Sequence, residues 1–255
     1  MKVTLLTHTP MPEYSVASAA KLCYSRSDID SIRENLDDEK VSGFVEMLAQ
    51  IGHESPIEHA SFTFGIEGVS RSLLAQITRH RMASFSVQSQ RYVKEAQFEY
   101  VLPPEIENNE QAKEIYIANM EKAQADYDKL TEILSKKHYE DFINMGQDEK
   151  TAKRNAEKKA IEDARFVLPN ACTTKMIMTM NARSLLNFFS HRCCNRAQWE
   201  IRELATQMYK LVYEVAPHIF AKAGPPCTRG ACTEGKMTCG EIQKVREKFK
   251  KIKGE

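Results

Sequence analysis

The densest group of side chains that could do chemistry lies between residues 76 and 92. The segment reads QITRHRMASFSVQSQRY and holds three arginines, one histidine, three serines and three glutamines. Guanidinium groups bind phosphate through paired hydrogen bonds, while amides and hydroxyls select a base or a sugar. If a helix ends near His80, Gln76 lies one turn before Arg79 and His80, and all three can face one pocket. The pattern is typical of a nucleotide site, and the alternative is a solvated helix end whose Arg and His cap carbonyls.

Three segments, in the right order, resemble the motifs of the flavin-dependent thymidylate synthases. They are Arg79-His80-Arg81 followed, after seven intervening residues, by Ser89-Gln90-Arg91-Tyr92; HESPIEH at 53–59; and NARSLLNFF at 181–189 continuing through Arg192 to AQWEIR at 197–202. The resemblance spans about residues 1–217. It implies an enzyme that methylates dUMP to dTMP, with methylenetetrahydrofolate as one-carbon donor and NADPH as hydride source through bound FAD.

The resemblance also implies a role for each matching residue. FAD would be bound by His53, Ser55, Arg79, His80, Arg81, Val87, Asn181, Arg183 and Asn187. The substrate dUMP would be bound by Gln76, Arg79, Ser89, Gln90, Arg91, Arg165 and Arg192. Arg192 would be the catalytic group, since an arginine beside uracil can stabilise negative charge as C5 becomes nucleophilic. Two positions depart from the family: Val87 can offer only backbone contact to FAD, and Cys23 stands where a small hydroxyl residue is sometimes found.

Several other functions fit parts of the sequence. Gly224-Pro225-Pro226-Cys227 is similar to the Pro-Cys setting of the cysteine nucleophile in conventional thymidylate synthases, which need no flavin. Ser89 near a histidine invites nucleophilic catalysis, but the sequence offers no third residue to orient the base, so substrate binding is favoured. Phe85 and Tyr92 beside arginines could form an RNA surface. No Gly-x-Gly-x-x-Gly follows a strand, so a dinucleotide-binding Rossmann fold is disfavoured.

Composition limits the class of protein. The 36 basic and 35 acidic residues leave a formal charge of +1, far from the basic excess of a nucleic-acid binder. No apolar run reaches membrane-spanning length, and the first residues show no signal peptide, so we expect a cytoplasmic protein. Seven cysteines scattered through the chain argue against a disulfide framework. The spacings of Cys227, Cys232 and Cys239 match no standard metal pattern, so free thiols and no metal are expected.

Hydrophobic periodicity predicts an α+β fold, with a small mixed or antiparallel sheet covered by several helices. Strands are expected at 3–7 and 60–67, with Gly68 ending the second, and at 172–180, where methionines could equally mark a buried helical stripe. Helices are expected at 15–24, 37–51, 70–80, 182–193 and 197–216. We expect one domain over 1–255, with a charged helical insertion at 108–163, interrupted near Gly146, and a cysteine-containing tail at 224–255.

The predicted helix that begins at Ala182 carries polar groups in two directions. On an ideal helix Arg183, Asn187 and Ser190 share a face, and Arg192 points nearly opposite Arg183. A monomer could leave one direction in solvent. The family resemblance implies instead a homotetramer whose active sites lie at subunit interfaces.

Overall fold

The computed structural model describes residues 1–91 and 98–254, so Tyr92 of the arginine-rich motif lies outside the described residues. The chain forms two compact units. Unit 1 comprises residues 1–66, 76–86 and 176–255, and unit 2 comprises residues 67–75 and 87–175. Strands β2 and β4 each pass from one unit into the other. The single-domain assignment therefore stays a prediction.

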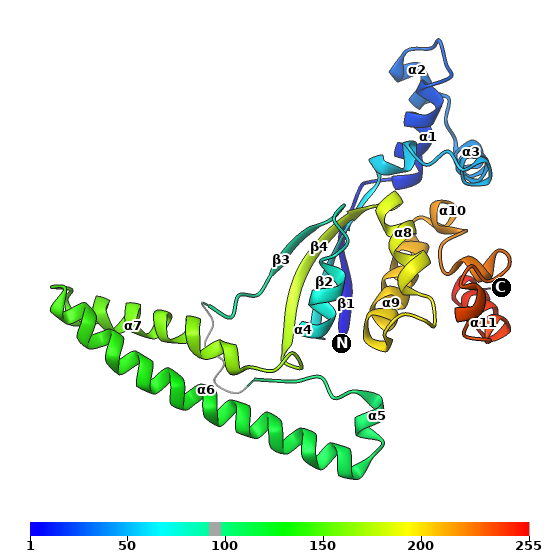
Figure 1. Cartoon of the computed structure of the whole chain (residues 1–255). Helices are drawn as coiled ribbons and strands as arrows, with labels where there is room; N and C mark the ends of the chain where they lie inside the picture. The colour runs from blue at the N-terminus through cyan, green and yellow to red at the C-terminus, as the bar shows by residue number, and fades with distance from the viewer. Residues whose placement is uncertain (92–97, 255) are drawn as a thin grey trace. The chain divides into compact units, whose positions relative to one another are not determined.

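Within the described residues, four strands form one antiparallel sheet in the order β1-β2-β4-β3, as Figure 1 shows. The strands are β1 (Lys2–His8), β2 (Ser61–Ser70), β3 (Ser84–Val87) and β4 (Thr173–Asn181). In β4 every second residue, Met176, Met178 and Met180, is buried, and this period of two settles the strand reading over the helical one. Together with the helices described below, the sheet confirms the predicted α+β class.

The prediction that Gly68 ends the second strand is wrong. Gly68 has φ +67°, a backbone conformation that glycine adopts without a Cβ clash, and β2 continues through it to Ser70. Both residues after the glycine, Val69 and Ser70, are buried. The next helix, α4 (Arg71–Ile77), ends three residues before the predicted His80. The chain therefore leaves helical geometry just where the arginine-rich motif begins.

The helices of unit 1 bury an aromatic core. They are α1 (Pro12–Leu22), α2 (Ile29–Glu34), α3 (Asp38–Ile51), α8 (Ala182–Arg192), α9 (Trp199–Val215), α10 (Pro217–Phe220) and α11 (Ile242–Lys253). Phe189 packs edge-on against Phe188, Tyr209 and Phe220, with ring centroids 5.6–6.0 Å apart. The last helix, α11, was not predicted within the tail, and its Phe249 ring lies 5.3 Å from Tyr209.

Unit 2 contains the predicted helical insertion. Its helices are α5 (Pro104–Glu107), α6 (Glu110–Asn144) and α7 (Glu149–Ala164), and Figure 1 shows α6 and α7 lying side by side. Gly146, with φ +85°, makes the turn between them at the predicted break. None of the helices in the described part of the chain combines the length and apolar character needed to cross a bilayer.

Gly224 gives a test of how tightly α11 is packed. It has φ +109°, and a Cβ there would lie 2.7 Å from the Phe249 ring. We expect Gly224→Ala to lower the free energy of unfolding by about 1–3 kcal/mol, because both the backbone and the buried ring would be strained. Gly43→Ala in α3 is the control. Nothing lies within 4 Å of a Cβ built on Gly43, so the free energy of unfolding should rise by up to about 1 kcal/mol. Equal denaturant midpoints for the two variants would contradict this packing.

Candidate functional site

The turn after α4 and the first half of α8 enclose a cavity of about 350 Å³ in unit 1. Its lining residues are Glu58, Arg79, His80, Arg81, Met82, Met180, Asn181, Arg183, Ser184 and Asn187. Six of the predicted FAD residues therefore meet in one place. Gln76, in α4, is not among the lining residues, so only Arg79 and His80 of the expected trio face this cavity.

The start of α8 fixes the direction of two of these side chains. Asn181 is its N-cap, and its side chain accepts a hydrogen bond of 2.8 Å from the Ser184 backbone N–H. Arg183, in the first turn, donates to carboxylates of Glu54 at 3.3 Å and Glu58 at 2.5 Å. Both glutamates belong to the 53–59 motif, but the resemblance implies no role for either. They hold the guanidinium between two cavities.

The second of these cavities, of about 640 Å³, lies between α3, α8 and the residues after Phe220. It shares Arg183 and Asn187 with the first and adds His53, whose Nε2 lies 3.2 Å from the Ser55 hydroxyl. Its walls also carry apolar groups, including Leu48, Ile57, Leu186 and Ile219. A ligand that reaches from one cavity to the other would thus meet both polar and apolar walls.

The charges around the first cavity differ in how they are balanced. Arg183 is neutralised by two carboxylates. Within residues 1–91 and 98–254, neither the Arg79 nor the Arg81 guanidinium forms an ion pair. Two unbalanced guanidiniums beside a cavity with both polar and apolar walls fit a cofactor that joins phosphates to a flat ring system, as FAD does.

Arg192 and His80 form the second feature of the site. The Arg192 Nε donates to His80 Nε2 at 3.1 Å, and both side chains line a third cavity, of about 390 Å³. His80 also packs edge-on against Phe188, with ring centroids 4.9 Å apart. Burial, together with the positive charges of Arg192 and His191, lowers the pKa of His80 from 6.5 to about 4. The imidazole is therefore neutral at physiological pH and can accept the bond.

That bond orients the Arg192 side chain and leaves its two terminal nitrogens unused. Only Nε is used, and the two terminal nitrogens of Arg192 have no partner among the described residues. A planar, anchored guanidinium with free terminal N–H groups can donate two parallel bonds to a ligand in the cavity. Thr233 and Glu234, which sequence reasoning missed, line the same cavity from the tail.

In unit 2, Arg91 and Arg165 both contact Glu162. The Arg91 Nε lies 2.8 Å from a Glu162 carboxylate oxygen, and the Arg165 Nε donates to the Glu162 carbonyl at 3.0 Å. Lys158 and Lys159 join Arg91 around a small cavity of about 260 Å³. Sequence reasoning took these two lysines only as part of the charged insertion. Lys158 and Lys159 precede Glu162 by one helical turn, and this spacing could have predicted that the three side chains lie on one face of the helix.

The remaining predicted residues lie close to Arg91 in the sequence. Val87 is the last residue of β3. The Ser89 hydroxyl accepts a hydrogen bond of 3.1 Å from the Arg91 backbone N–H, and Gln90 stands between them. The Gln88 carbonyl accepts from Arg71 at 3.1 Å, which fixes the chain just before this turn.

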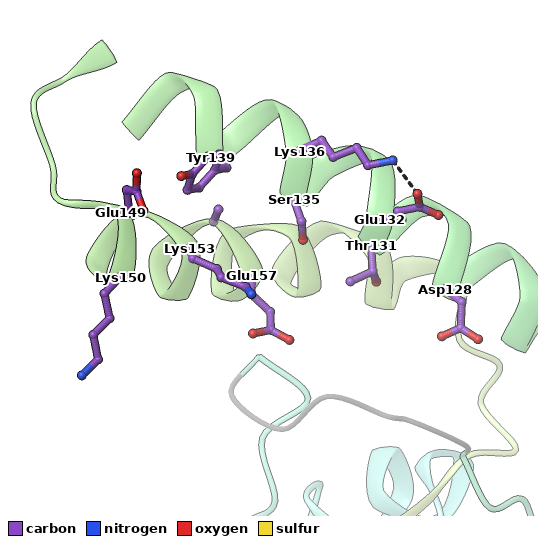
Figure 2. A pocket seen from close by; sticks show the side chains of 11 residues that line it. Asp128, Thr131, Glu132, Ser135, Lys136, Tyr139, Glu149, Lys150, Lys153 and Glu157 are labelled. Carbon is purple, nitrogen blue, oxygen red and sulfur yellow. Dashed lines mark hydrogen bonds and ion pairs between the residues drawn. The ribbon is translucent and has the colours of Figure 1, made fainter. Parts of the chain in front are cut away.

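A wider cavity lies elsewhere in unit 2, between α6 and α7, with a volume of about 960 Å³ (Figure 2). None of the predicted site residues lines it. Its rim carries ordinary helix-surface pairs such as Lys136 with Glu132 at 2.5 Å, marked by the dashed line in Figure 2. Size alone therefore does not locate the chemistry.

Comparison with known proteins identifies the family. Residues 4–218 match the family model described as thymidylate synthase complementing protein. A flavin-dependent thymidylate synthase from Clostridium tetani is 54% identical over 247 residues, covering 97% of this chain and 96% of that protein. The chain belongs to the flavin-dependent thymidylate synthases. A second member, from Geobacter sulfurreducens, is 46% identical over 254 residues and covers 99% of both chains.

A solved member of the flavin-dependent thymidylate synthases shares the fold. The crystal structure of flavin dependent thymidylate synthase ThyX from Helicobacter pylori, complexed with FAD and dUMP, has a TM-score of 0.61 at 23% identity. The match covers 88% of this chain and 100% of that one. Residues after 218 lie outside the family model, although Thr233 and Glu234 line the Arg192 cavity.

The lowered pKa of His80 can be measured directly. Because the folded imidazole binds its proton more weakly than the unfolded one, its charging removes stability as the pH falls from 6.5 to about 4, and costs nothing above that window. We expect a ¹³C-histidine NMR titration of flavin-free protein to show one resonance, absent in His80→Gln, that titrates near pH 4.

The Arg192→Gln variant separates the causes of that shift. Removing the neighbouring positive charge should raise the pKa of His80, while burial, the larger cause, should keep it below 6.5. A His80 pKa near 6.5 in the wild-type protein would show that the imidazole is not held as an acceptor for Arg192.

Proposed function

We propose that this chain catalyses the reductive methylation of dUMP to dTMP, with methylenetetrahydrofolate as one-carbon donor and NADPH as hydride source through bound FAD. The observation that carries the proposal is the Arg192 guanidinium, anchored through Nε by His80 beside a cavity, with terminal nitrogens that have no partner among the described residues. The same His80 lines the cavity that holds Arg79 and Arg81. A charge-stabilising group and a cofactor-like site therefore share one residue.

The proposed FAD site is the pair of cavities that meet at Arg183 and Asn187. The unbalanced charges of Arg79 and Arg81 would bind the FAD phosphates, with Asn181 and His80 beside them. His53 and Ser55 would contact the cofactor in the second cavity, and Val87 would offer only backbone contact. Bound FAD would supply the hydride that turns the transferred one-carbon unit into a methyl group. The Helicobacter pylori relative binds both FAD and dUMP, which supports this pairing of ligands.

The dUMP phosphate is proposed to bind Arg91 and Arg165, with Ser89, Gln90, Gln76 and Arg79 holding the nucleoside. The Arg91–Glu162 ion pair leaves its side chains 46% and 43% exposed. Such a pair contributes about 1 kcal/mol or less, so a doubly charged phosphate can replace the carboxylate as the partner of Arg91. Lys158 and Lys159 would add positive charge around that phosphate.

Arg192 is proposed to act on the uracil ring. Methylation requires C5 to become nucleophilic, and negative charge then grows on N3 and the neighbouring carbonyl oxygens. The terminal N–H groups of Arg192, if they donate to these atoms, would stabilise the growing charge. His80, neutral and bound to Nε, positions the guanidinium. No protein nucleophile is needed.

The structure weakens the conventional cysteine mechanism. Burial and the neighbouring thiols raise the pKa of Cys227, whereas a catalytic cysteine needs a lowered one. The Ser89 hydroxyl accepts from a backbone N–H and contacts no general base among the described residues, so we assign it to substrate binding. The near-neutral net charge speaks against the RNA surface.

We extend the proposal to assembly and location. Arg183 and Arg192 of α8 line different cavities. In a homotetramer with active sites at subunit interfaces, each of these two arginines would have a ligand to bind. A cytoplasmic location suits seven cysteines with no disulfide among the described residues.

Activity is the direct test of the proposed function. We expect tritium release from C5-labelled dUMP to require FAD, NADPH and methylenetetrahydrofolate together, with dTMP formed in equal amount. Flavin-stripped protein should be inactive and should recover on adding FAD. Equal turnover without flavin would refute the proposal and favour a cysteine-based synthase.

Kinetics should separate the arginines by role. Arg192→Ala should lower kcat about a hundredfold or more with FAD content unchanged, because the charge it faces grows only in the transition state. Arg192→Lys should rescue little, since lysine lacks the planar fork. Arg91→Ala and Arg165→Ala should mainly raise the KM for dUMP, by about thirty- to a hundredfold at most.

Arg154→Ala, an exposed arginine on α7 two turns before Glu162, is the control and should change neither constant. If Arg192→Ala kept a normal kcat and raised KM, Arg192 would belong with the phosphate-binding residues instead.

A further inference from the structure

The second cavity of unit 1 carries positive charge that the proposed FAD contacts do not use. Its wall contains three lysine or arginine side chains, Arg183, Lys222 and Arg229, and one carboxylate, that of Glu54. Arg183 already pairs with this carboxylate. Within residues 1–91 and 98–254, neither Lys222 nor Arg229 forms an ion pair. Two positive charges at this cavity are therefore unbalanced.

Hydrogen bonds to the backbone hold both of these side chains beside the cavity. The Lys222 Nζ donates to the Ala49 carbonyl at 3.2 Å, near the C-terminal end of α3. A terminal nitrogen of Arg229 donates to the Lys222 carbonyl. Stabilisation of the end of α3 would explain the Lys222 contact alone, and it gives Arg229 no role. Each bond uses one donor, so both cations keep N–H groups for a ligand.

Apolar side chains form the buried part of the same wall. Leu48 of α3, Ile57 of a short 3-10 helix (Pro56–His59) and Ile219 of α10 line the cavity, and all three are buried. Lys222 and Arg229, in contrast, are exposed. The cavity, of about 640 Å³, thus combines buried apolar groups with cations that contact solvent. Such a site suits a ligand with an apolar body and a negatively charged end.

The ligands of the proposed reaction differ in where they carry negative charge, and this inference rests on that proposed function. The FAD phosphates are assigned to Arg79 and Arg81, and the dUMP phosphate to Arg91 and Arg165. NADPH carries phosphate groups that are flanked by polar riboses. Methylenetetrahydrofolate has a flat pterin and a benzoyl ring, and it ends in a glutamate with two carboxylates. Of these ligands, the folate best matches an apolar wall with two exposed cations.

We propose that Lys222 and Arg229 bind the glutamate carboxylates of methylenetetrahydrofolate, whose rings enter the second cavity beside FAD. The one-carbon unit passes from this donor to the uracil and is reduced by the flavin, so the donor must bind next to FAD. Arg183 and Asn187 line both cavities, whereas Lys222 and Arg229 line only the second. The Arg229 guanidinium can bind a carboxylate through two parallel bonds, and the Lys222 ammonium can bind the other as a compact charge.

The proposal gives the tail of this chain a part in binding substrate. Lys222 and Arg229 lie beyond residue 218, where the family model ends, so the motifs imply no role for them. The chain that follows supplies Thr233 and Glu234 to the Arg192 cavity. The tail would therefore contribute side chains to two neighbouring ligand sites, both of which include Asn187 and Ser190.

The test measures binding and not turnover, on the FAD-loaded, full-length protein. The probes are 5-formyltetrahydrofolate, a stable analogue of the donor, and its diamide, in which both glutamate carboxylates are converted to carboxamides. We expect calorimetry to show that the wild-type protein binds the dicarboxylate about five- to twentyfold more tightly, since an exposed charge pair contributes up to about fivefold. Added salt should remove most of this preference, because the two cations are exposed.

The double variant Lys222→Gln/Arg229→Gln removes both charges and keeps an N–H donor for each backbone carbonyl. It should bind the dicarboxylate about five- to twentyfold more weakly than the wild-type protein does, and should bind the two probes equally. Its FAD content, its affinity for NADP⁺ and its midpoint of thermal unfolding should be unchanged. A purely structural role of the two cations would lower the midpoint and leave the preference between the probes intact.

Lys250→Gln/Lys251→Gln is the matched control. It removes the same charge from exposed side chains of α11 that line neither of the two cavities proposed for FAD nor the Arg192 cavity. This variant should keep the wild-type preference for the dicarboxylate. The comparison of the two probes on the wild-type protein tests the proposal even if the Lys222→Gln/Arg229→Gln protein fails to fold.

Several outcomes would overturn the proposal. They are equal binding of both probes by the wild-type protein, full affinity of the Lys222→Gln/Arg229→Gln protein for the dicarboxylate, and a loss of NADP⁺ or FAD binding in place of folate binding. A separate assay of dTMP formation by the wild-type protein distinguishes the two proposals. If the protein makes dTMP but binds both probes equally, only the carboxylate site is wrong. If it makes no dTMP and binds neither probe, the proposed function fails as well.

Discussion

The site of this protein depends on one junction between a strand and a helix. Strand β4 runs into α8 without a loop, and Asn181 ends the strand and caps the helix. The Ala182 N–H donates to the Ala60 carbonyl at 2.7 Å, which ties the first residue of the helix to the start of β2. Because these two hydrogen bonds fix the start of α8, the directions in which Arg183, Asn187 and Arg192 leave the helix follow from this junction.

The arginines around that helix are prepared in two different ways. Arg183 is held by carboxylates, and Arg192 is held by a neutral imidazole. A carboxylate partner cancels the charge of a guanidinium, whereas an imidazole partner fixes its direction and leaves its charge intact. The difference separates an arginine that shapes a cavity from one that can act on a ligand. His80 can serve in this way because burial keeps it uncharged.

Local patterns predicted much of the fold. Alternation found β2 and β4, and charged amphipathic spacing found α6 and α7 with the break at Gly146. Gly68 was misread because glycine in a strand can take a left-handed conformation and let the strand continue. Helix α11 was missed because its buried residues, Val245 and Phe249, are only two among many lysines.

The candidate site was predictable only as a set of residues. The motifs named nearly every residue of the first cavity, yet the Arg192–His80 bond joins positions 112 apart in sequence, and no local pattern reports such a contact. The roles proposed for these residues, like the homotetramer, NADPH and the cytoplasmic location, are predictions.

The packing of α11 has a consequence for how the family varies in length. Phe249 covers Tyr209, a fully buried ring of the aromatic core, although the helix lies beyond residue 218, where the family model ends. A relative that lacks this helix would leave that ring facing water, an apolar loss on the order of 1.5–3 kcal/mol. The identity of residue 209 and the presence of a C-terminal helix should therefore change together in evolution. Shorter members would carry a smaller or more polar side chain at this position, as a mark of where their chain ends.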